Sequence, residues 1–265
     1  MPFVTVRDLK VYYEIRGKGP RLLYISGSGG DLRGKPSVFD GTLPERFELL
    51  AYDQRGLGQT GGSAGEYTME DYAEDANGLL EGLGWDTCLV VGVSFGGMVA
   101  QEFAIRHPER VERMVLACTS PGGPLPSYPL HEFQGMAPEE RAVTSLLVSD
   151  TRAAAMRADD PERFGRMVQD SLTRMAVGAG EQGRAEGSAR QLEARRHHDT
   201  FERLPSLTMP VYICGGKYDG IAPPANLEAI HQQIAGSTME LFEGGHLFLL
   251  QDRAAWPKVM DFLLG

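Results

Sequence analysis

The sequence has few cysteines, no long apolar run and a shortage of basic residues, and each lack excludes a class of protein. Three cysteines among 265 residues, far apart and inside apolar runs, predict reduced core thiols. No apolar stretch reaches the roughly 18 residues of a membrane span, and no basic, apolar leader begins the chain. With 26 Lys and Arg against 36 Asp and Glu, the net charge of −10 disfavours nucleic acids and anionic membranes as partners. We expect a soluble, cytoplasmic protein.

The composition is that of a folded globular chain. Hydrophobic residues make up 42% and charged residues only 23%, which excludes a disordered chain. A chain of 265 residues is long enough to bury a full core without disulfides or metals. The length suits one large domain, or one domain with an insertion.

Short apolar runs alternate with amphipathic segments in the first 120 residues. Thr68, with Asp71 three residues on, opens a helix that Gly84 ends. Alternation of strand and helix predicts an α/β fold with a mostly parallel, doubly wound sheet. The clearest strands are expected at residues 11–15, 22–25, 47–52, 88–91 and 111–118, and a second helix at 95–107.

The alternation stops between residues 121 and 205. It returns after them, with strands expected at 211–214 and 239–242 and helices near 225–234 and 256–264. The segment 121–205 has helical stretches but no convincing strand, so we expect a helical cap inserted after the sixth strand, with residues 1–120 and 206–265 as the core domain. The segment contains eleven Arg and no Lys, a bias that suits either genomic composition or recognition of a carboxylate. Its methionines suit either core packing or a substrate wall; they are Met136, Met156, Met167 and Met175.

The strongest chemical signal is the motif Gly92-Val93-Ser94-Phe95-Gly96-Gly97. It lies directly after a predicted buried strand and directly before a helix. In that context a Gly-x-Ser-x-Gly motif forms a sharp turn that exposes the serine hydroxyl above the sheet. The glycines are needed because side chains would collide across so tight a turn. The Phe95 N–H, at the helix N-terminus, is available to a developing oxyanion.

A nucleophilic serine needs a base, and the base needs an orienting acid. Of the six histidines, His246 follows the last predicted strand in a glycine-rich loop, at the edge where open α/β sheets assemble their sites. His107 is expected to cap a helix, and His231 to lie on a solvated helix face. Asp219 emerges just beyond the strand at 211–214. The order Ser94, Asp219, His246 is that of a hydrolase triad.

These motifs resemble those of the α/β-hydrolase superfamily over essentially the whole chain, in particular small cap-bearing carboxylesterases and 3-oxoadipate enol-lactonases. The resemblance implies Ser94 as nucleophile, His246 as general base and Asp219 as the orienting acid. It also implies that the Ser28 N–H is the second oxyanion donor, in a loop that has Ser26 where relatives commonly have His. Neighbouring Gly27 is expected to contact substrate.

The resulting prediction is a serine hydrolase that cleaves a small-molecule ester or lactone without metal or organic cofactor. Thioesterase, carbon–carbon hydrolase and cofactor-free haloperoxidase activities use the same triad and remain open. A ligand receptor of the same fold, with slow turnover, is the alternative from another class. A homodimer is left open.

Asp53 and Arg55, after the third predicted strand, are interpreted as bracing a loop through an internal ion pair.

Overall fold

A computed structural model describes residues 2–265, which contain one eight-stranded sheet. In β3, Leu22, Leu23 and Ile25 are completely buried, as expected for a strand covered on both faces. In chain order, the strands are β1 (Phe3–Val6), β2 (Leu9–Arg16), β3 (Arg21–Ile25), β4 (Glu48–Tyr52), β5 (Cys88–Val93), β6 (Val111–Ala117), β7 (Val211–Gly216) and β8 (Thr238–Phe242).

The strand order across the sheet is β1-β2-β4-β3-β5-β6-β7-β8. The strands from β4 to β8 run parallel, whereas β2 pairs antiparallel with both β1 and β4, so an antiparallel hairpin forms one edge. This arrangement confirms the mostly parallel α/β fold. It also brings the carboxyl ends of β3, β5, β7 and β8 to the same edge, where the chain continues into the loops of the candidate site.

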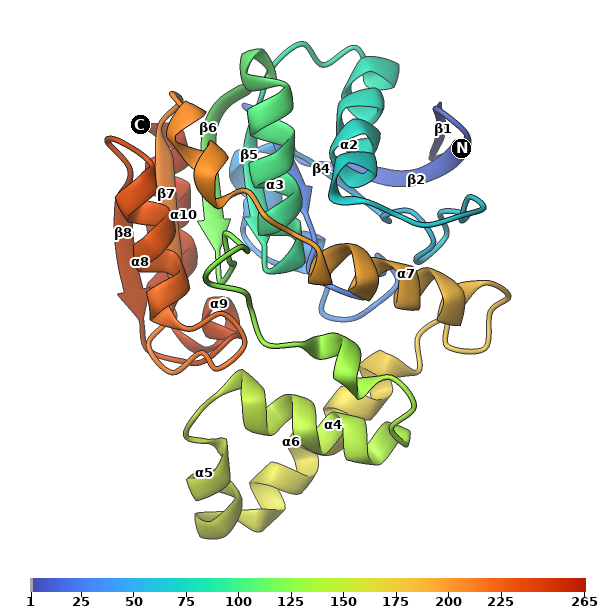
Figure 1. The fold of residues 1–265 in the computed structure, drawn as a ribbon, viewed down its shortest axis with the longest axis vertical. Coiled ribbons are helices and arrows are strands. Elements are labelled where there is room, and N and C mark those ends of the chain that lie inside the picture. The colour runs from blue at the N-terminus through green and yellow to red at the C-terminus, as the bar shows by residue number, and fades with distance from the viewer. Residues whose placement is uncertain (1) are drawn as a thin grey trace.

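Helices cover both faces of the sheet (Figure 1). One face carries α2, α3 and α8, and the other carries α1, α9 and α10, each with its own hydrophobic cluster. The predicted ends of α2 are confirmed. At its N-terminus the Thr68 Oγ1 accepts the Asp71 N–H at 3.1 Å, and at its C-terminus Gly84 ends the helix at φ +67°. The helices are α1 (Leu43–Arg46), α2 (Met69–Leu83), α3 (Phe95–Arg106), α8 (Pro224–Gln233), α9 (Phe248–Gln251) and α10 (Ala255–Leu264).

The chain between β6 and β7 folds as helices in two parts. Helices α4 (Pro138–Ser149), α5 (Ala153–Asp159) and α6 (Pro161–Met175) pack around a small cluster of their own and stand off one end of the sheet (Figure 1). Helix α7 (Arg184–Arg196) lies closer to the core, because its Ala194 joins the main hydrophobic cluster.

Four short 3-10 helices complete the secondary structure of residues 2–265. They are η1 (Val38–Asp40), η2 (Pro108–Arg110), η3 (Leu130–Phe133) and η4 (Phe201–Ser206). Leu204 of η4 also belongs to the main cluster, so the last part of residues 121–205 packs as core. Within residues 2–265, each helix is too short or too polar to cross a membrane.

Candidate active site

Ser94 stands alone on a sharp turn between β5 and α3. Its backbone has φ +56° and ψ −116°, a strained combination for a residue with a side chain. A Cβ on Gly92 would overlap the carbonyl oxygen of Gly96, and a Cβ on Gly96 would overlap that of Ile25. The two glycines of the motif are therefore required by close backbone approach, as the sequence predicts.

The structure brings Ser94, His246 and Asp219 into one hydrogen-bonded chain. The Asp219 carboxylate can only accept, so the His246 Nδ1–H donates to its Oδ2 at 2.7 Å. In the neutral imidazole this leaves Nε2 as the acceptor, 2.9 Å from the Ser94 Oγ. The Asp219 Oδ1 is held by the N–H groups of Ile221 and Ala222, at 2.7 and 3.0 Å.

The hydrogen-bonded residues Ser94, His246 and Asp219 are shielded from water. The Asp219 side chain is fully buried and that of His246 is only 12% exposed. The His246 N–H donates to the Ser149 carbonyl of α4 at 2.6 Å, so the helical segment touches the site directly. The Cys118 thiol lies within 4.8 Å of the Asp219 and His246 ligand atoms, and burial raises its pKa well above the ordinary value. Cys118 is therefore a neutral thiol beside the carboxylate at neutral pH.

Two backbone N–H groups beside the serine are free of intramolecular partners within residues 2–265. The Phe95 N–H is the first of α3, where a helix leaves its donors unsatisfied. The Ser28 N–H lies in the turn of residues 27–30, which the Gly30 N–H closes on the Gly27 carbonyl at 3.2 Å. A Cβ on Gly27 would lie 3.5 Å from that of Ser94, so this turn borders the serine.

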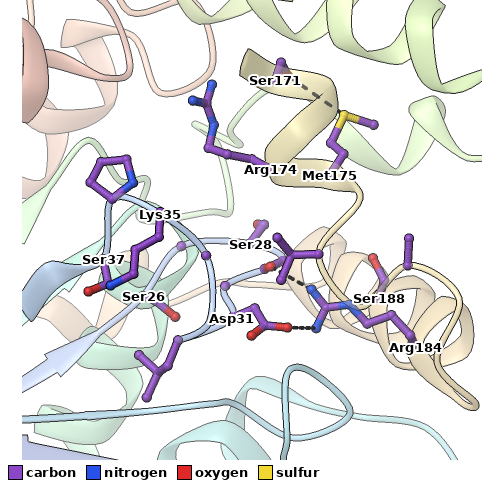
Figure 2. Close-up of a pocket in the computed structure, with 18 of the residues that line it drawn as sticks. Ser26, Ser28, Asp31, Lys35, Ser37, Ser171, Arg174, Met175, Arg184 and Ser188 are labelled. Carbon is purple, nitrogen blue, oxygen red and sulfur yellow. Dashed lines mark hydrogen bonds and ion pairs between the residues drawn. The ribbon is translucent and has the colours of Figure 1, made fainter. Parts of the chain in front are cut away.

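A cavity of about 610 Å³ opens beside this turn, between the loop of residues 26–38 and helices α4, α6 and α7 (Figure 2). Of the residues predicted to contact substrate, Gly27 and Met175 line it. The other three predicted methionines do not line this cavity: Met167 packs against the cluster inside α4–α6, and Met136 and Met156 lie elsewhere in the segment.

Three arginines of the helical segment also line the cavity: Arg141, Arg174 and Arg184. Asp31 is paired with Arg33 and Arg184, at 2.7 and 3.7 Å. Within residues 2–265, Arg141 of α4 and Arg174 of α6 have no carboxylate within ion-pairing distance. Figure 2 shows the Arg174 guanidinium reaching from α6 into the space above the loop.

Asp53 and Arg55 brace loops, but they do not pair with each other as predicted. Arg55 forms a buried ion pair with Asp75, with Nε 2.6 Å from Oδ2. Asp53 instead accepts the N–H groups of Leu32 and Gln59, both at 2.8 Å, and burial raises its pKa to about 6. The geometry differs because the guanidinium reaches across to α2, whereas the carboxylate stays under the loop that follows β3.

The remaining histidines have structural contacts. His107 caps α3 and His231 is exposed, as predicted. His198 is buried, with Nε2 3.2 Å from the Ser120 carbonyl, and burial lowers its pKa to about 3.

Sequence reasoning missed Gln54, whose Nε2 donates to the Ser26 carbonyl at 2.7 Å. Its position after Asp53, at the end of a strand on the site edge, was the available signal.

Comparison with known proteins agrees with this architecture. Residues 20–252 match the model of the alpha/beta hydrolase fold family, so the chain belongs to the α/β-hydrolase family. It is 23% identical to 3-oxoadipate enol-lactonase 2 of Acinetobacter baylyi, over 98% of this chain and 95% of that protein. It is 26% identical to a poly(3-hydroxyalkanoate) depolymerase of Ectopseudomonas oleovorans, over 91% of this chain and 83% of that protein.

A solved structure gives the same result. The enol-lactonase of Burkholderia xenovorans superposes with a TM-score of 0.81 at 26% identity, and the match covers 100% of both chains. The protein is thus a hydrolase of this family that is similar to enol-lactonases.

Proposed function

We propose that the protein is a serine hydrolase of carboxylic esters or lactones that works through an acyl-enzyme on Ser94. The observation that carries the proposal is the chain from the Ser94 Oγ through His246 to Asp219. A serine hydroxyl becomes a competent nucleophile when a neutral imidazole accepts its proton. The carboxylate fixes the tautomer that leaves Nε2 free to do so and stabilises the imidazolium that forms.

The reaction has two halves. The Ser94 Oγ attacks the carbonyl carbon as its proton moves to the His246 Nε2, and the carbonyl oxygen becomes an oxyanion. The Phe95 and Ser28 N–H groups stabilise this charge. When the tetrahedral intermediate collapses, His246 donates the proton to the departing oxygen, which in a lactone stays attached to the acyl group. Water then attacks the acyl carbon as it loses a proton to the His246 Nε2. When this second intermediate collapses, His246 returns the proton to the Ser94 Oγ and the acid is released.

The experiment is labelling with a fluorophosphonate beside a panel of esters, lactones and thioesters. We expect label on Ser94 alone and turnover of roughly 1–1,000 per second on the best substrate. Ser94→Ala should lose both while its melting temperature stays nearly unchanged. Label that persists in this variant would contradict the assignment of the nucleophile. Ligand binding with very slow turnover would favour a receptor of the same fold.

We further propose that the preferred substrate carries a carboxylate. One support is that Arg141 and Arg174 line the cavity and have no carboxylate partner within residues 2–265. The other is the relative named for 3-oxoadipate. A p-nitrophenyl hemiester of a dicarboxylic acid should be preferred over the neutral ester of equal length. Arg174→Gln should raise KM for the charged ester only, by about two- to fivefold, the size of one exposed charge pair. Arg166→Gln, on the same helix but outside the cavity wall, is the matched control.

A further inference from the structure

The peptide groups on both sides of the Ser28 N–H are held by side chains. Before it, the Ser26 carbonyl accepts from Gln54. After it, the Gly29 N–H donates to the Gln191 Oε1 at 2.7 Å, and the Gly29 carbonyl accepts from the Arg184 Nη2 at 3.0 Å. Gln191 and Arg184 both belong to α7, more than 150 residues further along the chain. Figure 2 shows Arg184 extending from α7 toward Asp31 and this turn.

The contact with Gln191 acts on the central peptide of the turn. Residues 27–30 close with the Gly30 N–H on the Gly27 carbonyl, and Gly29 has φ +72°, which together define a type II turn. Type I and type II turns differ in the orientation of the peptide between the second and third residues, here Ser28 and Gly29. An acceptor facing the Gly29 N–H therefore stabilises one of the two orientations.

Gln191 is suited to holding the Gly29 N–H because its side chain is buried away from water. Its side chain is fully buried, and its Nε2 has no partner within residues 2–265. A buried, uncharged acceptor makes a strong and direction-dependent hydrogen bond. Gly29, by contrast, has no atom within 4 Å of the place where its side chain would be, so packing does not restrain it. The hydrogen bonds from α7 are what fix this end of the turn.

We propose that Gln191, assisted by Arg184, is a positioning residue: it fixes the 27–30 turn so that the Ser28 N–H is held for the oxyanion. This inference rests on the proposed function. It makes α7 part of the machinery for transition-state stabilisation, because displacement of the helix would release the turn. A donor misplaced by about 1 Å loses much of its effect on the transition state, whereas binding of the uncharged ground-state carbonyl changes little.

The test compares Gln191→Leu, which removes the acceptor, with Gln191→Glu, which keeps an acceptor oxygen. For Gln191→Leu we expect kcat to fall by about 10–100-fold, somewhat less than the loss of a whole oxyanion donor, with KM within about twofold of wild type. Affinity for a boronic acid, which forms a tetrahedral adduct on the serine, should fall in parallel. Gln191→Glu should restore most of kcat.

Two further variants keep the test decisive. Glu181→Gln breaks the pair between Glu181 and Arg33, 2.8 Å apart, which also joins the α7 side to the 27–38 loop but does not touch the turn. Its kcat should be unchanged. Arg184→Met removes the contact with the Gly29 carbonyl and should lower kcat by a smaller factor. It replaces Gln191→Leu if that variant is unfolded.

The outcomes separate the inference from the proposed function. Wild-type protein that turns over substrate while both Gln191→Leu and Arg184→Met keep full kcat would overturn the inference alone. So would equal losses of kcat and melting temperature in Gln191→Leu and Gln191→Glu, which would indicate a merely structural role. Wild-type protein with neither turnover nor label on Ser94 would overturn the proposed function, and this inference with it.

Discussion

The two proposed oxyanion donors are built in different ways. On the elbow side, Phe95 follows a serine whose N–H donates to Ala117 and whose carbonyl accepts from Thr119, both at 2.8 Å. Gly96 there leaves no room for even a methyl group. On the loop side, the turn with Ser28 is open around Gly29 and is held by hydrogen bonds from α7.

The two oxyanion donors are therefore held in place by different kinds of contact. The elbow is fixed mainly by backbone atoms packed against one another inside the core, with the Thr119 hydroxyl as one side-chain contact. The loop side is fixed by a few side-chain hydrogen bonds between segments far apart in sequence. One comes from Gln54, and the others come from α7, in the helical segment that also walls the cavity. The loop side is therefore the half whose geometry depends on the state of α7.

The largest expected effect concerns Asp219, which orients the general base His246 and belongs to neither oxyanion donor. In Asp219→Asn, the amide oxygen would stay with the N–H groups of Ile221 and Ala222, because they can only donate. The amide NH₂ would then face His246 and impose the wrong tautomer. We expect a loss of roughly 10⁴-fold in turnover with an intact fold. Near-normal steady-state activity would mean that another group orients His246.

A second prediction separates the backbone of Ser28 from its hydroxyl. Ser28→Pro removes the N–H and should lower turnover by on the order of 10²–10³-fold, the usual effect of losing one donor. Ser28→Ala should lose little, although the Ser28 Oγ is buried without a partner within residues 2–265 and Ser28 lines the cavity. A large loss in Ser28→Ala, with Ser28→Pro no worse, would assign the role to the hydroxyl. An unchanged melting curve is required of the proline variant, because proline also restricts Gly27.

The elbow side could be predicted from the sequence, and the loop side only in part. Ser94, Asp219 and His246 each follow a parallel strand by a few residues, so the topology of the sheet alone brings them together. Gln191 has no such signal: it lies in a polar helix, and its contact with Gly29 depends on where α7 docks. The methionines show the same limit, because apolar spacing identifies a buried face without telling whether core or substrate covers it.

A third prediction compares the two sides directly through stability. Gly96→Ala places a methyl group against the Ile25 carbonyl, and backbone cannot give way as a side chain can. We expect a loss of about 3 kcal/mol or more in the free energy of unfolding. Gly29→Ala meets no atom and should cost only about 1 kcal/mol, the strain of a left-handed alanine. Urea unfolding of both variants measures the contrast, and equal losses would remove the distinction between the two sides.

The smallest expected effect concerns neutral side chains beside the elbow. The Gln101 Nε2 donates to the carbonyls of Gly97 and Ser120, both at 3.1 Å. The His198 Nε2 also faces the Ser120 carbonyl, and burial lowers the pKa of His198 to about 3 from an ordinary value near 6.5. The unfolded chain therefore binds a proton that the folded protein refuses between these values, so stability is complete above about pH 6.5 and is lost as the pH falls.

At pH 5 this coupling should cost on the order of 2 kcal/mol, about 1.4 kcal/mol for each pH unit below 6.5. His198→Gln keeps a side-chain donor for the Ser120 carbonyl but cannot take up a proton. Urea unfolding of wild type and variant at pH 7 and pH 5 isolates the contribution, because the carboxylates titrate in both. The wild type should lose about 2 kcal/mol more than the variant over this interval. Parallel losses would show that the folded protein takes up a proton on His198 as readily as the unfolded chain does, and the elbow side would then be no more sensitive to acid than the rest of the core.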